Sequence, residues 1–211
     1  MQVRAAMVGL DRCLPGKPWV FGLSLLPLVF LVVAAVLERL GANPAEALIR
    51  STGDWTLRFL CMVLALTPLR VELRLARLAS YRRMLGLFCF FYGLLHLLCY
   101  AVLDMGLEVP EVLKDIAKRP FILVGFGAFV VLLVLALTSW SGAIRWLGGR
   151  RWQRLHRGVY LVAPLVVLHF FWMRASKNNL AEVWWYAGVL TGLLAWRGWR
   201  KWIPKVPSTR M

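Results

Sequence analysis

The run RRWQRLHRGVYLVAPLVVLHFFW, residues 150–172, joins a block of arginines and a histidine to an apolar segment that ends in a second histidine and aromatic residues. The chain has three histidines, and two of them, His156 and His169, lie in this run. The third, His96, lies inside another apolar segment at 84–103. A histidine in a membrane helix is costly and faces the protein interior, so both segments predict a functional site inside a helix bundle.

Composition places the chain among membrane proteins. Of its 211 residues 60% are hydrophobic, and the mean hydropathy is +0.67, whereas soluble domains are about 45–50% apolar. The net charge of +16 comes from short basic clusters between apolar runs, which is the pattern of membrane topology signals. We therefore expect membrane lipid, and no nucleic acid, around the chain. The four cysteines form no CxxC pair and predict no zinc site.

The apolar runs predict an all-α integral membrane protein with six transmembrane helices in one bundle. Runs of this kind cross a hydrocarbon core of about 30 Å as helices. The expected spans are 19–37, 55–69, 84–103, 120–137, 155–172 and 183–196. We expect polar connections at 41–54, 104–119 and 145–157. The domains are a cytoplasmic arm at 1–17, a six-helix transmembrane domain at 18–202 and a cytoplasmic tail at 203–211.

The charges predict the orientation of this bundle. Most of the 26 Lys and Arg residues fall in the N-terminal arm, in the loops 70–83 and 145–157, and in the tail. By the positive-inside rule these segments are cytoplasmic, so both termini are inside. The acid-rich loop at 104–119 then faces the other compartment.

Orientation gives the depth of each histidine. His96 follows Arg83 by about 13 residues and His169 follows Arg157 by about 12, or roughly 18–20 Å at 1.5 Å per residue. Their helices run in the same direction, so both imidazoles are expected at one level in the outer half of the membrane. His156 is expected at the cytoplasmic boundary. Gly125 and Gly127, in the fourth expected span, favour close approach of a neighbouring helix.

Two imidazoles at one depth on neighbouring helices are what axial ligation of a haem iron requires. The alternative is that each histidine only bonds to a neighbouring helix. For His156 a cofactor contact and a plain interfacial position stay open. The pocket is expected to draw on nearby aromatic residues, namely Phe90, Phe91, Tyr92, Tyr100, Phe170, Phe171 and Trp172.

The run LGGRRWQRLHRGVYL, residues 147–161, resembles the signature of the MsrQ (YedZ) family, within the ferric-reductase-like transmembrane group. Shorter landmarks resemble the family in the same order: TGDW at 52–55, TPLR at 67–70, RRMLG at 82–86 and TS at 138–139. The resemblance covers nearly all of the chain except the N-terminal arm and the last ten or so residues.

This resemblance implies a multi-pass protein of the bacterial inner membrane with haem b and FMN. The quinone pool or a cytoplasmic flavin reductase would supply electrons. The acceptor would be MsrP, a periplasmic molybdopterin reductase that repairs oxidised methionines. The chain would be the electron-transfer subunit and not the methionine-sulfoxide reductase itself. His96, His169 and His156 are the expected cofactor-binding residues, with His96 and His169 on the iron.

This chain also differs from the larger members of the ferric-reductase-like group. Larger ferric reductases and NADPH oxidases hold two stacked haems with two histidines on each of two helices. Thirteen residues before His96 this chain has Arg83, so a second bis-histidine haem is not expected. The chain has no GxGxxG motif for a dinucleotide.

Two other functions fit parts of the pattern. One is a generic cytochrome b that delivers electrons to ferric iron or another acceptor. The other is a haem-free transporter or scaffold, against which stand the lack of an inverted repeat and of acidic residues at mid-membrane depth. For FMN, the cytoplasmic arginines suit the phosphate and a tryptophan suits the ring, but no single residue stands out.

Overall fold

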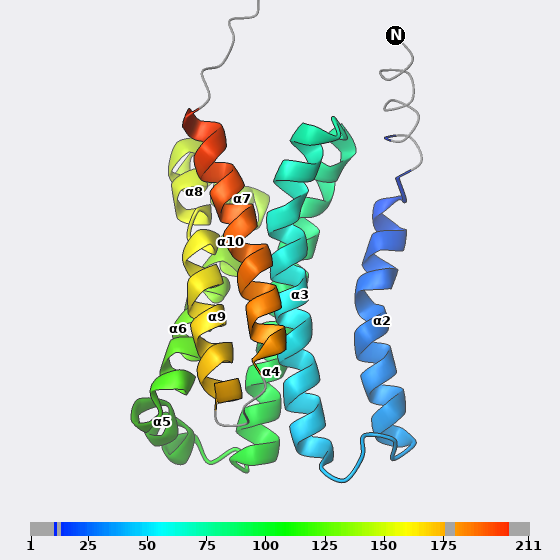
Figure 1. Ribbon diagram of the computed structural model, residues 1–211, viewed down its shortest axis with the longest axis vertical. Coiled ribbons are helices and arrows are strands. Elements are labelled where there is room, and N and C mark those ends of the chain that lie inside the picture. The colour runs from blue at the N-terminus through cyan, green and yellow to red at the C-terminus, as the bar shows by residue number, and fades with distance from the viewer. Residues whose placement is uncertain (1–10, 12–13, 176–179, 203–211) are drawn as a thin grey trace, which may run out of the picture.

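The computed structural model describes residue 11, residues 14–175 and residues 180–202. Every regular element in this part of the chain is a helix, which confirms the all-α class. The long helices lie side by side along one axis (Figure 1): α2 (Lys17–Val36), α3 (Pro44–Glu72), α4 (Arg82–Cys99), α6 (Pro120–Leu137), α9 (Val159–Ala175) and α10 (Ala181–Trp202).

Shorter helices cover the two ends of the bundle (Figure 1). The 3-10 helix η1 (Ala76–Tyr81), α7 (Ser141–Leu147) and α8 (Gly149–His156) lie at one end. The π-helical turn η2 (Tyr100–Asp104) and α5 (Val109–Lys118) lie at the other. We call the end with α7 and α8 the basic end, and the end with α5, which carries the acid-rich segment 104–119, the acidic end.

Within the described residues, four helical stretches are long and apolar enough to cross a membrane: Lys17–Val36, Ala76–Asp104, Pro120–Leu137 and Gly149–Ala175. Large apolar side chains on them are open to the surroundings, for example Phe30 at 71% and Leu137 at 65%. Such surfaces suit contact with lipid tails, which are as apolar as these side chains. These helices indicate a membrane protein. Helices α3 and α10 are also long, with 29 and 22 residues, but they are more polar.

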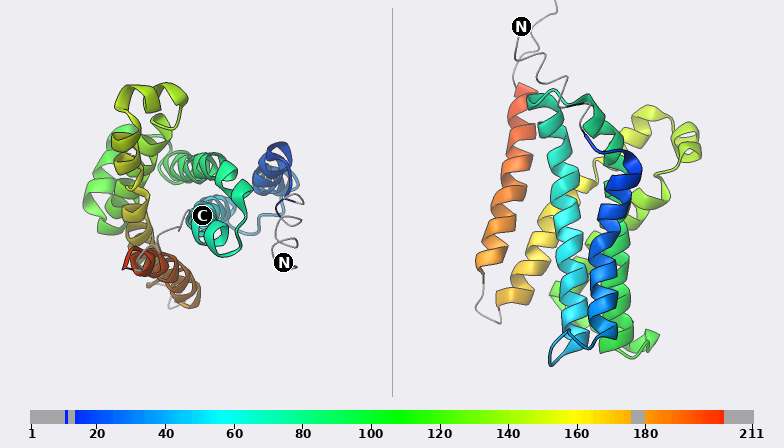
Figure 2. Two further views of the ribbon diagram at one scale, coloured as in Figure 1. Left: turned by 90° about the horizontal axis from the view of Figure 1, so that it is seen from above. Right: turned by 90° about the vertical axis from the view of Figure 1, so that its right-hand side faces the viewer.

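Helices α3 and α4 form the centre of the bundle, with α2 on one side and α6 and α9 on the other (Figure 2). Tyr92 of α4 joins α2 to this centre, and its side chain is fully buried. Its hydroxyl donates to the Ser24 carbonyl at 2.8 Å and accepts from the Leu28 amide at 3.2 Å. These two backbone groups are four residues apart and would bond to each other in an uninterrupted helix. The Tyr92 hydroxyl thus enters the hydrogen-bond ladder of α2 one residue after Pro27.

Three segments that were predicted to be irregular connections contain helix instead. The segment predicted as a polar connection at 41–54 is helix from Pro44 onward. Asn43 caps this helix, since its side chain accepts from the Glu46 amide at 3.1 Å and Pro44 occupies the first position. The predicted loop 104–119 contains α5, and the predicted loop 145–157 contains α8.

The predicted fifth span at 155–172 also begins too early. The chain breaks between α8 and α9 at Arg157 and Gly158, so His156 lies on a different helix from His169. The predicted tail at 203–211 lies outside the described residues, as does most of the predicted arm at 1–17.

Candidate functional site

Two cavities lie between α3, α4, α6 and α9, and Leu132 lines both. The histidine cavity, of about 260 Å³, is lined by His96 and His169 near the acidic end of the bundle. The arginine cavity, of about 460 Å³, is lined by Arg82, Arg83, Arg157 and His156 near the basic end. The structure therefore brings two of the three predicted histidines together and puts the third elsewhere.

His96 is held by the neighbouring helix α3. Its Nδ1 lies 2.8 Å from the carbonyl oxygen of Ile49. A carbonyl only accepts, so Nδ1 carries the proton and Nε2 keeps its lone pair. Gly53, one turn further along α3, makes room for the ring, because a Cβ there would lie 3.1 Å from both Cε1 and Nδ1 of His96.

His169 is held by α6 in the same way. Its Nδ1 lies 2.7 Å from the carbonyl oxygen of Phe121, so Nε2 again keeps its lone pair. Gly125 makes room for the ring, and a Cβ there would lie 2.6 Å from Nδ1 of His169. The glycine once more follows the accepting carbonyl by four residues. The sequence separations from carbonyl to histidine, 47 and 48 residues, are nearly equal.

The two imidazoles face the same cavity with their ring centres 6.2 Å apart and their planes at 77°. A metal–imidazole nitrogen bond is about 2 Å long, and that nitrogen lies about 1.2 Å from the ring centre, so two imidazoles on opposite sides of one metal have centres about 6.4 Å apart. The distance between His96 and His169 fits this arrangement. A hydrogen bond from the other ring nitrogen to a carbonyl is also the usual support of a metal-bound histidine.

The lining of the histidine cavity suits a flat apolar group. Within the described residues no cluster of three or more His, Cys, Asp or Glu side chains is placed to hold a bare metal ion. Two of the aromatic residues expected here, Tyr100 and Phe170, do line the cavity. The other five lie outside its lining, and Phe121, Phe126 and Phe129 of α6 take their place.

His156 has a different environment in the arginine cavity. Its ring stacks on Trp152 with centres 4.0 Å apart, and its Nε2 lies 3.1 Å from Oγ1 of Thr138. Thr138 Oγ1 also lies 2.7 Å from the Val134 carbonyl oxygen, to which it donates its one proton. The hydroxyl then accepts from Nε2–H of His156. The protonated nitrogen is thus Nε2, opposite to the assignment for His96 and His169.

The arginine cavity is strongly basic. Arg82, Arg83 and Arg157 line it, and the described part of its wall contains no carboxylate. Such a cavity suits an anionic ligand, with Trp152 offering an aromatic face.

The sequence reasoning missed four positions that lie against the cavity histidines: the carbonyls of Ile49 and Phe121, and the glycines Gly53 and Gly125. For Gly125 the sequence indicated only close helix packing. A usable signal existed, because a glycine in a helical segment precedes each cavity histidine by nearly the same number of residues. Gly127 differs from Gly125, because a Cβ added to it would have no neighbour within 4 Å.

Comparison with known proteins adds independent evidence. Residues 52–167 match the family described as "Ferric reductase like transmembrane component". The chain is 60% identical over 186 residues to the protein-methionine-sulfoxide reductase heme-binding subunit MsrQ of Polaromonas naphthalenivorans, covering 88% of this chain and 85% of the relative. It is 52% identical over 180 residues to the protein of the same name from Ralstonia nicotianae, covering 85% and 83%.

A more distant similarity links the chain to a larger protein. The magnetosome protein MamZ of Magnetospirillum gryphiswaldense is 41% identical over 193 residues, which cover 86% of this chain and 30% of MamZ. No solved structure matches the chain.

Proposed function

Because the chain belongs to the MsrQ family of haem-binding membrane subunits of protein-methionine-sulfoxide reductase systems, we propose that it carries electrons across a bacterial inner membrane. The acceptor is a periplasmic molybdopterin reductase of the MsrP type, which repairs oxidised methionines in proteins. The observation that carries this proposal is the pair of imidazoles at 6.2 Å, each held through Nδ1 by a carbonyl.

In this proposal His96 and His169 would hold the iron of one haem b. A bound haem supplies a one-electron redox centre whose potential depends on its ligands and surroundings. The protein holds each imidazole in one tautomer and one orientation through Ile49 and Phe121. The glycines behind the rings keep both imidazoles close to their supporting helices.

We further propose six membrane spans with both termini in the cytoplasm. The alternating directions of α2, α3, α4, α6, α9 and α10 in Figure 1 support the span number. The basic end with α7 and α8 is then cytoplasmic, and the end with α5 faces the periplasm. Reporter fusions at Glu111 and Arg151 test this directly. Glu111 should report outside and Arg151 inside, and the opposite result at either position contradicts the orientation.

We assign FMN to the arginine cavity. Arg82, Arg83 and Arg157 suit a phosphate, and Trp152 suits a flat ring. His156 contacts this cofactor and does not bind iron, in keeping with its engaged Nε2. Electrons would enter at this end, from either the quinone pool or a cytoplasmic flavin reductase, and the histidine cavity would deliver them to the acceptor at the other end.

The test uses the purified protein with its native cofactors. A pyridine-haemochrome and flavin assay should give one haem and one FMN per chain. Reduction by a quinol or by a flavin reductase should then be followed by oxidation on adding purified MsrP. A haem that reduces ferric chelates but never MsrP would favour a generic ferric reductase, whose family pattern matches residues 52–167. Absence of haem after expression with adequate haem supply would contradict both.

A further inference from the structure

The histidine cavity has two arginines in its lining, Arg50 and Arg119. Each belongs to the side of the cavity that supports one histidine. Arg50 follows Ile49 on α3, and Arg119 is the residue directly before α6, two positions before Phe121. Each histidine of the pair therefore has one arginine on the element that supports it.

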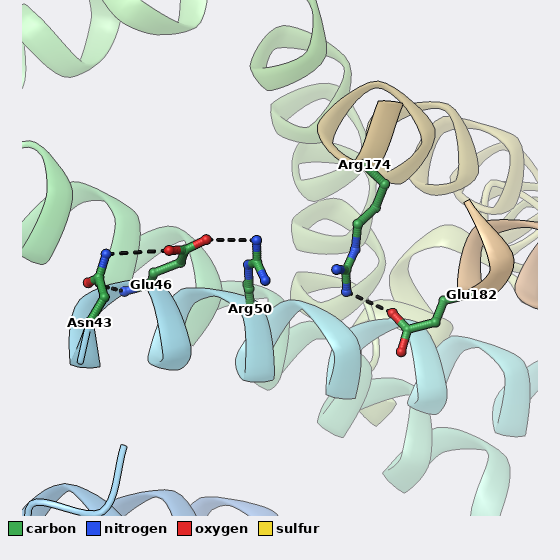
Figure 3. Close-up of polar contacts among 5 residues, drawn as sticks. All are labelled: Asn43, Glu46, Arg50, Arg174 and Glu182. Carbon is green, nitrogen blue, oxygen red and sulfur yellow. Dashed lines mark hydrogen bonds and ion pairs between the residues drawn. The ribbon is translucent and has the colours of Figure 1, made fainter. Parts of the chain in front are cut away.

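Each of the two arginines forms an ion pair with a carboxylate. Nη2 of Arg50 lies 2.7 Å from Oε1 of Glu46, and the Glu46 carboxylate also accepts from the Asn43 side chain at 3.4 Å. Figure 3 shows Asn43, Glu46 and Arg50 in a row along the first turns of α3. This row starts at the residue that caps the helix, so Glu46 links the Arg50 guanidinium to the helix end.

Arg119, whose side chain is 53% exposed, has a similar set of partners on the other side. Its Nε lies 2.8 Å from Oδ1 of Asp115, and Oδ2 of Asp115 accepts from the Tyr100 hydroxyl at 2.6 Å. Tyr100 itself lines the cavity. A guanidinium has five N–H donors, so one ion pair leaves others to bind a further carboxylate.

We propose that Arg50 and Arg119 bind the two carboxylates at the edge of the haem, one each. This inference rests on the haem ligation proposed above and adds the residues that orient the cofactor within the cavity. Arginine is suited to the task because its fork matches a carboxylate with two charge-assisted hydrogen bonds. The same lining contains Asp54 and Asp104, which repel an added carboxylate, so the two arginines are needed to balance the charge.

Removal of one arginine has two measurable consequences. The variants Arg50→Ala and Arg119→Ala should lose haem to an excess of a haem-accepting apoprotein at least about tenfold faster, since a charge-assisted bond is lost. The reduction potential should also become more negative, because a nearby cation stabilises the reduced form, which carries one more negative charge. Arg50→Lys should keep the potential near that of the wild type while restoring retention only in part. Lys114→Ala is the control, because Lys114 is exposed on α5, outside the cavity lining, and its partner is Glu111.

Haem dimethyl ester gives a second measurement that needs no variant. With its carboxylates blocked, the ester should bind wild-type protein more weakly than haem does, and the double variant Arg50→Ala/Arg119→Ala should lose this preference. Unchanged haem retention and potential in both single variants, with the low-spin spectrum intact, would overturn the arginine assignment alone. A wild-type protein without low-spin haem would overturn the proposed haem site and this assignment with it.

Discussion

The two cavities lie in the same bundle between the same four helices, yet their histidines differ in which ring nitrogen is hydrogen-bonded. In the histidine cavity both Nδ1 atoms donate to carbonyls and both Nε2 atoms keep their lone pairs. In the arginine cavity the Nε2 atom of His156 is bonded to Thr138 and its ring is stacked on Trp152. In our proposal the partner of the second ring nitrogen, and not burial in an apolar helix, distinguishes a histidine that would bind iron from one that would only contact a cofactor.

The largest effect is expected from the ligand pair. Replacing either His96 or His169 by alanine should leave one axial position without its imidazole, so the low-spin absorbance spectrum should be lost or become high-spin. Haem content of the purified variants, measured as pyridine haemochrome, should fall together with electron delivery to MsrP. The matched control is His156→Ala, which should keep the low-spin spectrum. Wild-type spectra in both His96→Ala and His169→Ala would show that the pairing is wrong.

A smaller effect is expected from the glycines behind the rings. In Gly125→Ala the new Cβ would lie 2.6 Å from Nδ1 of His169, so the imidazole has to move and its bond to the Phe121 carbonyl is lost. In Gly53→Ala the corresponding distance to His96 is 3.1 Å, which a small shift relieves. Haem occupancy should therefore fall strongly in Gly125→Ala and moderately in Gly53→Ala.

Gly127→Ala supplies the control for this pair. It lies on the same helix as Gly125, with nothing within 4 Å of the added methyl group. Alanine also favours a helix by roughly 1 kcal/mol over glycine, so this variant should be as stable as the wild type or more so. Equal haem occupancy in all three variants would contradict the role of the glycines as room for the imidazoles.

Much of this comparison could be predicted from the sequence because hydropathy and charge are local signals. The apolar runs gave the helices, and α6 begins and ends where expected, at Pro120 and Leu137. The pairing of His96 with His169 followed from equal distances to the basic helix ends, and the structure does bring these two rings together. Depth along a helix needs only the rise per residue.

Other features depend on contacts between distant segments and could not be predicted in this way. The first turns of α3 are helical because Asn43 caps the helix. The many polar residues of this segment made it resemble a loop in the sequence. The support of each imidazole depends on which carbonyl faces it across a helix interface, and a carbonyl has no signature in the sequence. The separation of His156 from His169 depends on a break at Gly158, where the apolar run alone suggested a continuous helix.

A third prediction concerns the arginine cavity itself. His156→Ala removes the ring that stacks on Trp152 and should lower the FMN content of the purified protein and the rate of haem reduction by a cytoplasmic-side donor. The haem spectrum and haem content should stay unchanged, because His156 lines a different cavity from His96 and His169. Loss of half or more of the haem in this variant would show instead that His156 binds iron. Unchanged flavin content and unchanged reduction rate would leave His156 as an interfacial residue without a role in transfer.

The smallest effect is expected from Thr138→Val, which tests whether His156 contacts FMN or can bind iron. Valine has nearly the shape of threonine but lacks the hydroxyl that accepts from Nε2–H, so one hydrogen bond worth about 0.5–1.5 kcal/mol is lost. The stack on Trp152 should persist, because the Trp152 indole donates to the backbone carbonyl of Thr138 at 2.8 Å, which the substitution leaves in place. FMN retention should therefore fall less than in His156→Ala, and Thr138→Ser, which keeps a hydroxyl, should behave as the wild type. If His156 could bind iron once its bond to Thr138 is removed, Thr138→Val would free Nε2 and the haem spectrum would change. If His156 only contacts FMN, the haem spectrum should be the same in the wild type, Thr138→Val and Thr138→Ser.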